Sequence, residues 1–135
     1  MKRQTNKSNG NEGRSKLIRI FTDGAGSRPD GKGSGFAWLR EDTGEKHIQR
    51  VDGLTNNEAE YRGLRSALER LPKKSVAEIY TDSQLMCSQF NGLYKVRDPK
   101  LQDLLEEIRQ LIVTKELRIT LYWVPRNSNP SGKLL

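Results

Sequence analysis

Two short apolar runs in this sequence end in the same way, and their ends constrain the fold more than any other feature. Residues 17–22 lead into Asp23-Gly24, and residues 76–81 lead into Asp82. Each run has the length of a buried β-strand, and the first, a mostly apolar run without alternation, is predicted to be a central strand covered on both faces. The segment between them suits a crossover that makes the two strands parallel neighbours. Asp23 and Asp82 would then emerge side by side at the carboxyl ends, where open α/β sheets place their ligands.

The crossover contains a predicted helix at residues 56–71, which Pro72 stops. Thr55 followed by Glu58 three residues later is a capping box. In helical steps from Glu58 every position is charged, which predicts a solvated face. The same helical spacing from Glu60 reaches leucines and an alanine, which predicts that this face of the helix packs against the core. Glu60 therefore points into the protein near the start of the helix.

A carboxylate on an apolar helix face costs free energy unless something compensates its charge, and a metal ion would do so. With Asp23 and Asp82, Glu60 completes a set of three carboxylates on rigid elements, the kind of oxygen ligands that a hard divalent cation binds. Their mutual repulsion also favours cation binding. The alternative is that Glu60 lies at the edge of the apolar face, where the positive end of the helix stabilises it.

The rest of the chain predicts an α/β domain. Residues 36–39 and 48–51 are read as the strands of a hairpin that turns around residues 42–44. Two further helices and a final strand are expected at residues 83–90, 99–113 and 117–124. Residues 16–135 are therefore expected to form one domain. Residues 1–15, which are polar and basic, are expected to be a disordered tail.

The composition narrows the class of partner. The 135 residues have a net charge of +7 and 30% charged side chains, which favours a polyanionic partner and disfavours a membrane span. No hydrophobic signal segment stands at the N-terminus, so we expect a cytoplasmic protein, and we expect it to be a monomer. Cys87 is the single cysteine, so no intramolecular disulfide forms, and we read it as a buried, inert thiol. His47, the single histidine, has no partner for a triad or a metal cluster and is read as a surface residue.

Three segments, in the order in which they occur, resemble type 1 ribonuclease H. They are Phe-Thr-Asp-Gly-Ala at residues 21–25, Thr-Asn-Asn at residues 55–57 followed by Glu60, and Tyr-Thr-Asp-Ser-Gln at residues 80–84. The resemblance implies a ribonuclease H-like fold, with a mixed five-stranded sheet flanked by helices. It also implies an endonuclease that cuts the RNA strand of RNA–DNA hybrids with two divalent ions, Mg²⁺ or Mn²⁺. The products would have 5′-phosphate and 3′-hydroxyl ends.

The resemblance implies roles for individual residues as well. Asp23, Glu60 and Asp82 match three of the family's four metal-binding carboxylates. The positions assigned to substrate binding are Gly24, Thr55, Asn56, Asn57 and Gln84. Among these, the threonine would bind a phosphate of the DNA strand. The amides would read the minor groove and the ribose hydroxyls, because short amides can both donate and accept hydrogen bonds.

The fourth carboxylate is where the chain departs from the family. The family pattern Asn-x-x-Ala-Asp-x-Leu corresponds to residues 129–135, which place Lys133 where aspartate is expected. An ammonium cannot bind a metal ion, so the part of the site that activates water is altered, and the final helix is expected to be absent. The side-chain oxygen of Asn129 is the candidate for the missing ligand, with Asn127 as the weaker one. The alternative for Asn129 is an N-cap that precedes Pro130.

Two other family features are missing. Residues 124–130 lack the histidine of the bacterial prototype and contain Arg126 as their only basic group, which is placed to contact a phosphate or help the product leave. A short segment with Lys95, Arg97 and Lys100 replaces the long basic protrusion of some members. We therefore expect weaker hybrid binding that depends steeply on salt.

The sequence leaves three functions to compare. An active, metal-dependent ribonuclease H is the main hypothesis. A catalytically impaired hybrid-binding module is the alternative, because the fourth carboxylate is missing. A nuclease of the same fold that acts on a Holliday junction or on double-stranded RNA is disfavoured by Asn56, Asn57 and Gln84, which match hybrid-reading positions.

Overall fold

The computed structural model describes residues 16–135, so the tail expected at residues 1–15 lies outside the described residues. At its centre is a five-stranded sheet in the order β4-β3-β2-β5-β6. The strands are β2 (Leu17–Ala25), β3 (Gly35–Arg40), β4 (Lys46–Arg50), β5 (Val76–Thr81) and β6 (Arg118–Trp123). The helices are α1 (Asn56–Arg70), α2 (Gln84–Phe90) and α3 (Pro99–Thr114), and two short 3₁₀ turns follow as η1 (Arg126–Ser128) and η2 (Pro130–Leu134). The order of elements expected from the sequence is confirmed.

The sheet is mixed, as the resemblance implied. β3 pairs antiparallel with both β2 and β4, which confirms the hairpin. β2, β5 and β6 run parallel, with Phe21 opposite Tyr80. The crossover through α1 therefore brings the carboxyl ends of β2 and β5 to the same edge of the sheet. β2 extends beyond the expected residue 22 because its pairing with β3 continues to Ala25, opposite Gly35.

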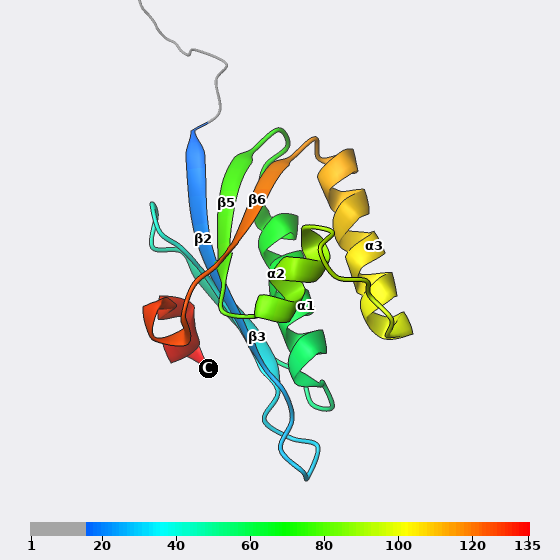
Figure 1. Ribbon diagram of the computed structural model, residues 1–135. Coiled ribbons are helices and arrows are strands. Elements are labelled where there is room, and N and C mark those ends of the chain that lie inside the picture. The colour runs from blue at the N-terminus through cyan, green and yellow to red at the C-terminus, as the bar shows by residue number, and fades with distance from the viewer. Residues whose placement is uncertain (1–15) are drawn as a thin grey trace, which may run out of the picture.

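The three helices pack on one face of the sheet (Figure 1). α1 lies over β2 and β3, α3 packs beside α1, and α2 contacts β6. The core between these layers includes Ile18, Ile20, Trp38, Tyr61, Leu64, Leu68, Ile79, Leu104, Ile108 and Leu121. Full burial of an aliphatic or aromatic side chain contributes about 1.5–3 kcal/mol. This packing holds the start of α1 firmly against the end of β2.

β2 was expected to be covered on both faces, and this expectation is wrong. Burial alternates along the strand, so that Ile18 is buried while Leu17 is 41% exposed. η2 lies on the side of the sheet away from the helices, where it contacts β2 and β3 (Figure 1). On the rest of that face Phe21, Tyr80 and Tyr122 stack, with ring centroids 5.0 and 5.5 Å apart. These cross-strand aromatic contacts take the place of a second helical layer, which is why the run lacks a polar alternation.

The face of α1 that begins at Glu58 was expected to be solvated, and the structure corrects this. Glu58 is only 8% exposed because it forms both hydrogen bonds of the predicted capping box with Thr55, each 3.1 Å long. Further along the same face, Arg65 forms an ion pair with Glu107 of α3. α3 therefore covers a side of α1 that an isolated helix would leave in water.

Cys87 and His47 both lie away from the edge of the sheet at which β2 and β5 end. Cys87 is half-buried on α2, and burial raises the pKa of its thiol, which is consistent with an inert side chain. His47 stacks on the ring of Trp38, with centroids 5.7 Å apart, so it is partly covered rather than freely exposed. Among residues 16–135, no helix has the length and apolar character needed to cross a membrane.

One ammonium group caps the end of α1, and its removal should destabilise the fold. Lys115 donates from Nζ to the carbonyl oxygens of Leu68, Glu69 and Leu71. We expect Lys115→Met to lower the melting temperature by roughly 3–6 °C, because these carbonyls lose a charged donor worth on the order of 1–2 kcal/mol. Thermal unfolding followed by circular dichroism measures the change, with the exposed Lys73→Met as the matched control. A shift no larger than that of the control would contradict the capping role.

Candidate active site

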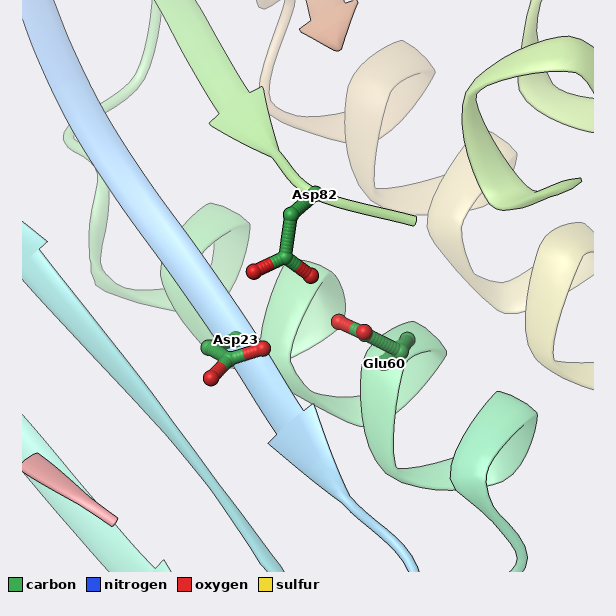
Figure 2. A group of neighbouring side chains, drawn as sticks. All are labelled: Asp23, Glu60 and Asp82. Carbon is green, nitrogen blue, oxygen red and sulfur yellow. The ribbon is translucent and has the colours of Figure 1, made fainter. Parts of the chain in front are cut away.

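Three carboxylates meet at the edge of the sheet where β2 and β5 end (Figure 2). Asp23 lies near the end of β2, Asp82 follows the last residue of β5, and Glu60 comes from the start of α1. One oxygen of each carboxylate lies within 4.8 Å of the others. Within residues 16–135, this is the only cluster of acidic, histidine or cysteine side chains with the spacing of a metal site. The convergence predicted from the strand ends and the helix face is present in the structure.

Gly24 lets α1 approach β2 closely enough for Glu60 to reach Asp23. A side chain at residue 24 would overlap the backbone of Ala59 and Glu60, so glycine is required by the contact itself. The backbone N–H of Gly24 also stabilises the charged forms of Asp23 and Glu60. The sequence had assigned Gly24 to substrate binding, and the structure adds this packing role.

Burial and mutual repulsion raise the pKa values of two of the carboxylates. The pKa of Glu60 is raised to about 9, first by burial and then by the charges of Asp23 and Asp82. The pKa of Asp23 is raised to about 6, first by burial and then by Asp82. The positive charge of Arg126 opposes both shifts. Shifts of this kind mark carboxylates whose charged forms need a compensating partner.

The donor set fits a divalent cation. Glu60 is 8% exposed, and its buried Oε1 has no hydrogen-bond partner. A buried polar oxygen without a partner costs free energy, and a cation between the three carboxylates would satisfy it. Carboxylate oxygens are the ligands that hard divalent cations prefer. Asp23, Glu60 and Asp82 are therefore the residues that could hold such an ion.

The polar residues assigned to substrate binding lie at two helix starts beside the carboxylates. Thr55 is the N-cap of α1, and the Oδ1 of Asn56 accepts a hydrogen bond of 2.7 Å from the backbone N–H of Gly26. Asn57 and Gln84 are exposed in the first turns of α1 and α2. The helix-entry role expected for Thr55 is therefore present, and the amides of Asn57 and Gln84 are open to solvent.

A cleft of about 710 Å³ lies between two of the carboxylates, Asp23 and Glu60, and the C-terminal segment. Asp23, Asn56 and Glu60 line one side of it. Residues 126–130, together with Gly132 and Lys133, line the other side. The cleft brings Arg126, which the sequence had singled out, beside the acidic cluster.

Two residues next to the carboxylates were not predicted. Trp123 donates from Nε1 to the backbone carbonyl oxygen of Asp82, at 3.3 Å. Gly132 lies against Asp23, because a Cβ added to it would stand 3.2 Å from Asp23 Oδ2. The sequence contained a signal for Trp123, because this tryptophan ends the strand that neighbours β5. No signal in the sequence marked Gly132, because a glycine beside Lys133 in a polar segment is typical of a solvated turn.

Asn129 lies close to the carboxylates, and its side chain forms the hydrogen bonds of an N-cap, so its role as a metal ligand stays a prediction. Its Oδ1 accepts hydrogen bonds from the backbone N–H and the hydroxyl of Ser131, which is the N-cap alternative. Its Nδ2 donates to the carbonyl oxygen of Thr22 at 2.8 Å and lies 3.4 Å from Asp82 Oδ2. An N–H needs an acceptor and a carbonyl needs a donor, so the backbone partners determine which way the amide faces. Asn127, the weaker candidate, is exposed at the cleft.

A carboxylate at residue 129 should destabilise the fold rather than complete the metal site. Asn129→Asp keeps an acceptor for Ser131 but places oxygen against the carbonyl of Thr22 and the carboxylate of Asp82. We expect the melting temperature in EDTA to fall by roughly 5 °C, since a donor is lost and a like charge is added. Differential scanning calorimetry measures this, with the exposed Asn127→Asp as the control. Equal melting temperatures for the two variants would show that the amide is not held as described.

Comparisons with known proteins agree with the resemblance that the sequence motifs indicated. A family model described as RNase H matches residues 15–130. Ribonuclease H of Polynucleobacter asymbioticus is 34% identical over 130 residues, and the match covers 87% of this chain and 83% of that protein. The bifunctional protein Rv2228c of Mycobacterium tuberculosis is 37% identical over 83 residues, which cover 60% of this chain. The match spans only 22% of the length of that mycobacterial protein.

Two solved structures are similar over most of the chain. The N-terminal RNase H domain of Rv2228c, solved as a fusion with maltose-binding protein, superimposes with a TM-score of 0.75 at 31% identity, covering 87% of this chain and 95% of that one. LC11-RNase H1 in complex with an RNA/DNA hybrid gives a TM-score of 0.74 at 26% identity, covering 87% and 92%. The mixed five-stranded sheet with three helices agrees with these structures.

Proposed function

This chain belongs to the ribonuclease H family, and we propose that it is an endonuclease that cleaves the RNA strand of RNA–DNA hybrids with divalent metal ions. The observation that carries the proposal is the meeting of Asp23, Glu60 and Asp82, with a buried oxygen of Glu60 left without a partner. The hybrid bound to LC11-RNase H1 supports the substrate class. The net charge of +7 is consistent with a polyanionic substrate.

The three carboxylates would hold the ions, which we propose to be two Mg²⁺ or Mn²⁺. Bound divalent ions supply the positive charge that activates water and stabilises the leaving 3′-oxygen. The contribution of the chain is positional: Asp23 stands on β2, Glu60 on α1 and Asp82 directly after β5, and the shared core holds these elements rigidly. Cleavage would leave 5′-phosphate and 3′-hydroxyl ends.

Contacts to the hybrid are assigned to residues beside the carboxylates, namely Gly24, Thr55, Asn56, Asn57 and Gln84. Hybrids are recognised through groove shape and 2′-hydroxyls, which exposed amides at helix starts are suited to contact. Arg126 lines the cleft, and its charge already acts on Asp23 and Glu60, so it can pair with a phosphate that enters there. A single chain contains all of these groups, so the active form would be a monomer, and we place it in the cytoplasm.

A catalytically impaired hybrid-binding module is the second candidate. Two observations favour it: Lys133 stands where the family pattern has its fourth carboxylate, and the oxygen of Asn129 is engaged by Ser131. This candidate predicts hybrid binding without turnover. The endonuclease predicts turnover that depends on the remaining carboxylates.

A cleavage assay separates the two candidates. An RNA–DNA hybrid labelled on either strand is incubated with the full chain and Mg²⁺ or Mn²⁺, with single-stranded and double-stranded RNA in parallel. We expect cuts in the RNA strand of the hybrid alone. Hybrid binding without any cut in either metal would favour the binding module, and cuts in double-stranded RNA would contradict the proposed substrate class.

A further inference from the structure

Residues 51–54 connect β4 to α1 without belonging to a helix or a strand. Residues 55–57 follow directly, and they include three of the positions that the proposed function assigns to contacts with the hybrid. A connecting segment of this kind has no strand ladder or helix to bind its peptide groups, so these groups need partners from elsewhere in the chain. The partners come from the loop between β2 and β3.

Ser34 is the centre of these contacts. Its hydroxyl donates to the carbonyl oxygen of Val51 and accepts from the backbone N–H of Leu54 at 3.2 Å. It also accepts from the hydroxyl of Ser27 at 3.1 Å. A serine hydroxyl has one hydrogen and two lone pairs, so its whole capacity for hydrogen bonds is used. Ser34 is 0% exposed, so solvent does not compete for these bonds.

Ser27 extends the same set of contacts. Its hydroxyl accepts from the backbone N–H of Gly53 at 3.0 Å, and its own N–H donates to the carbonyl oxygen of Leu54 at 2.8 Å. The carbonyl oxygen of Ser34 accepts from the N–H of Val51 at 3.1 Å. The two serines therefore hold the peptide groups of the segment that leads into α1, and through them the residues at the helix start.

The two serines and the carboxylates are held in place by different contacts. Neither Ser27 nor Ser34 lines the cleft beside the carboxylates, whereas Asn56 does. Glu60 is positioned by the close approach of α1 to Gly24 and by the core. Loss of the serine hydrogen bonds should therefore displace residues 55–57 and leave the carboxylates where they are.

We propose that the hydroxyl pair of Ser27 and Ser34 positions residues 55–57 for the hybrid, and that it determines the affinity for the substrate rather than the rate of the chemical step. The inference rests on the function proposed above. Both serines are positioning residues, because they act through residues 51–57 and not by contact with the nucleic acid. Contacts that are equally strong in the ground state and the transition state change KM and leave kcat unaltered.

Steady-state cleavage of the labelled hybrid by Ser34→Ala tests the proposal, with Ser75→Ala as the matched control. Ser75 is also buried, and its hydroxyl donates to the carbonyl oxygen of Pro72 at 2.6 Å, just before β5 and at the end of that strand away from Asp82. We expect Ser34→Ala to raise KM roughly tenfold and to leave kcat within about twofold of the wild type. Ser75→Ala should lower the melting temperature but leave KM and kcat unchanged.

Further variants show through which residues Ser34 acts. In a chain that already carries Asn56→Ala and Asn57→Ala, Ser34→Ala should change KM by no more than about threefold, because effects along one set of contacts are not additive. Ser27→Ala removes one hydroxyl of the pair and should raise KM less than Ser34→Ala does. If circular dichroism shows that Ser34→Ala does not fold, the KM of Ser27→Ala decides, and an unchanged value would contradict the proposal.

Other results would overturn this inference alone. They are a wild type that cleaves hybrids while Ser34→Ala retains the same KM, a lower kcat with an unchanged KM, an equal rise of KM in Ser75→Ala, and a full effect of Ser34→Ala in the chain without the two amides. A wild type that neither binds nor cleaves hybrids would overturn the proposed function as well. If the wild type binds hybrids without cleaving them, the endonuclease is wrong, and the dissociation constant of the hybrid replaces KM in the same comparison.

Discussion

Replacing Asp82 by asparagine is expected to lower the rate of RNA-strand cleavage by about 10³-fold or more while leaving the fold intact. Asparagine has the size of aspartate but lacks its charge, so the site loses one of three carboxylates that would hold the ions. Loss of several kcal/mol of charge stabilisation in the transition state corresponds to a change of this size, at about 1.4 kcal/mol per tenfold. The hydrogen bond from Trp123 reaches the backbone carbonyl of Asp82 and is retained.

The control for this prediction is the same substitution on an exposed surface. Asp103 lies on the solvent side of α3, so Asp103→Asn changes the net charge equally without touching the site. Single-turnover cleavage of the labelled hybrid compares the two variants, and circular dichroism confirms the fold. Cleavage by Asp82→Asn within tenfold of the Asp103→Asn rate would remove Asp82 from the proposed site.

Glu60→Gln is expected to make the protein more stable in EDTA at alkaline pH and to abolish cleavage. The pKa of Glu60 is raised from 4.5 to about 9 in the folded protein, so the folded state holds a proton that the unfolded state releases. Its contribution to stability is therefore fully present below pH about 4.5 and is lost as the pH rises to about 9. Glutamine cannot lose a proton, so the variant avoids this loss.

The measurement is the melting temperature in EDTA as a function of pH. For the wild type we expect a fall between pH about 5 and about 9, and for Glu60→Gln a melting temperature higher by roughly 5 °C at the alkaline end. The pKa of Asp23 is raised from 3.8 to about 6, so loss of its proton also lowers the melting temperature as the pH rises to about 6. Both the wild type and Glu60→Gln should therefore show a fall in melting temperature over this range.

A metal ion that binds the folded state but not the unfolded state stabilises the folded state. Addition of Mn²⁺ at alkaline pH should therefore raise the melting temperature of the wild type and leave that of Glu60→Gln, which lacks one of the three carboxylates, almost unchanged. Glu106→Gln, on the exposed side of α3, is the matched control and should behave like the wild type. A wild-type melting temperature that is independent of pH in EDTA would contradict the buried, proton-holding carboxylate.

Several parts of the site could be predicted because their causes are local. Apolar runs that end in aspartate indicated two strand ends, and the leucine spacing of α1 placed Glu60 on the inner face. The capping box of Thr55 and Glu58 was likewise readable from residues three positions apart, and it is present. Apolar runs, helix periodicity and capping involve residues that are close in the sequence, so the sequence contains the information directly.

Other features depend on partners that are distant in the sequence. Arg65, on the face of α1 that begins at Glu58, pairs with Glu107 of α3, and the rings of Phe21 and Tyr80 stack on the face of β2 that no helix covers. The sequence pattern aligned Lys133 with the fourth carboxylate and gave no sign of a contact at Gly132. In the structure Gly132 lies against Asp23, because η2 packs on β2 and β3.

The sequence by itself therefore determined the class of the fold, the three carboxylates and the elements on which they stand, since periodicity and strand ends are properties of short segments. Only the tertiary structure decided the direction of the Asn129 amide, because its partner, the carbonyl of Thr22, lies 107 residues away. The same holds for the approach of Gly132 to Asp23. Contacts of this kind form only when the sheet is complete and the C-terminal segment packs on β2, and no local pattern encodes them.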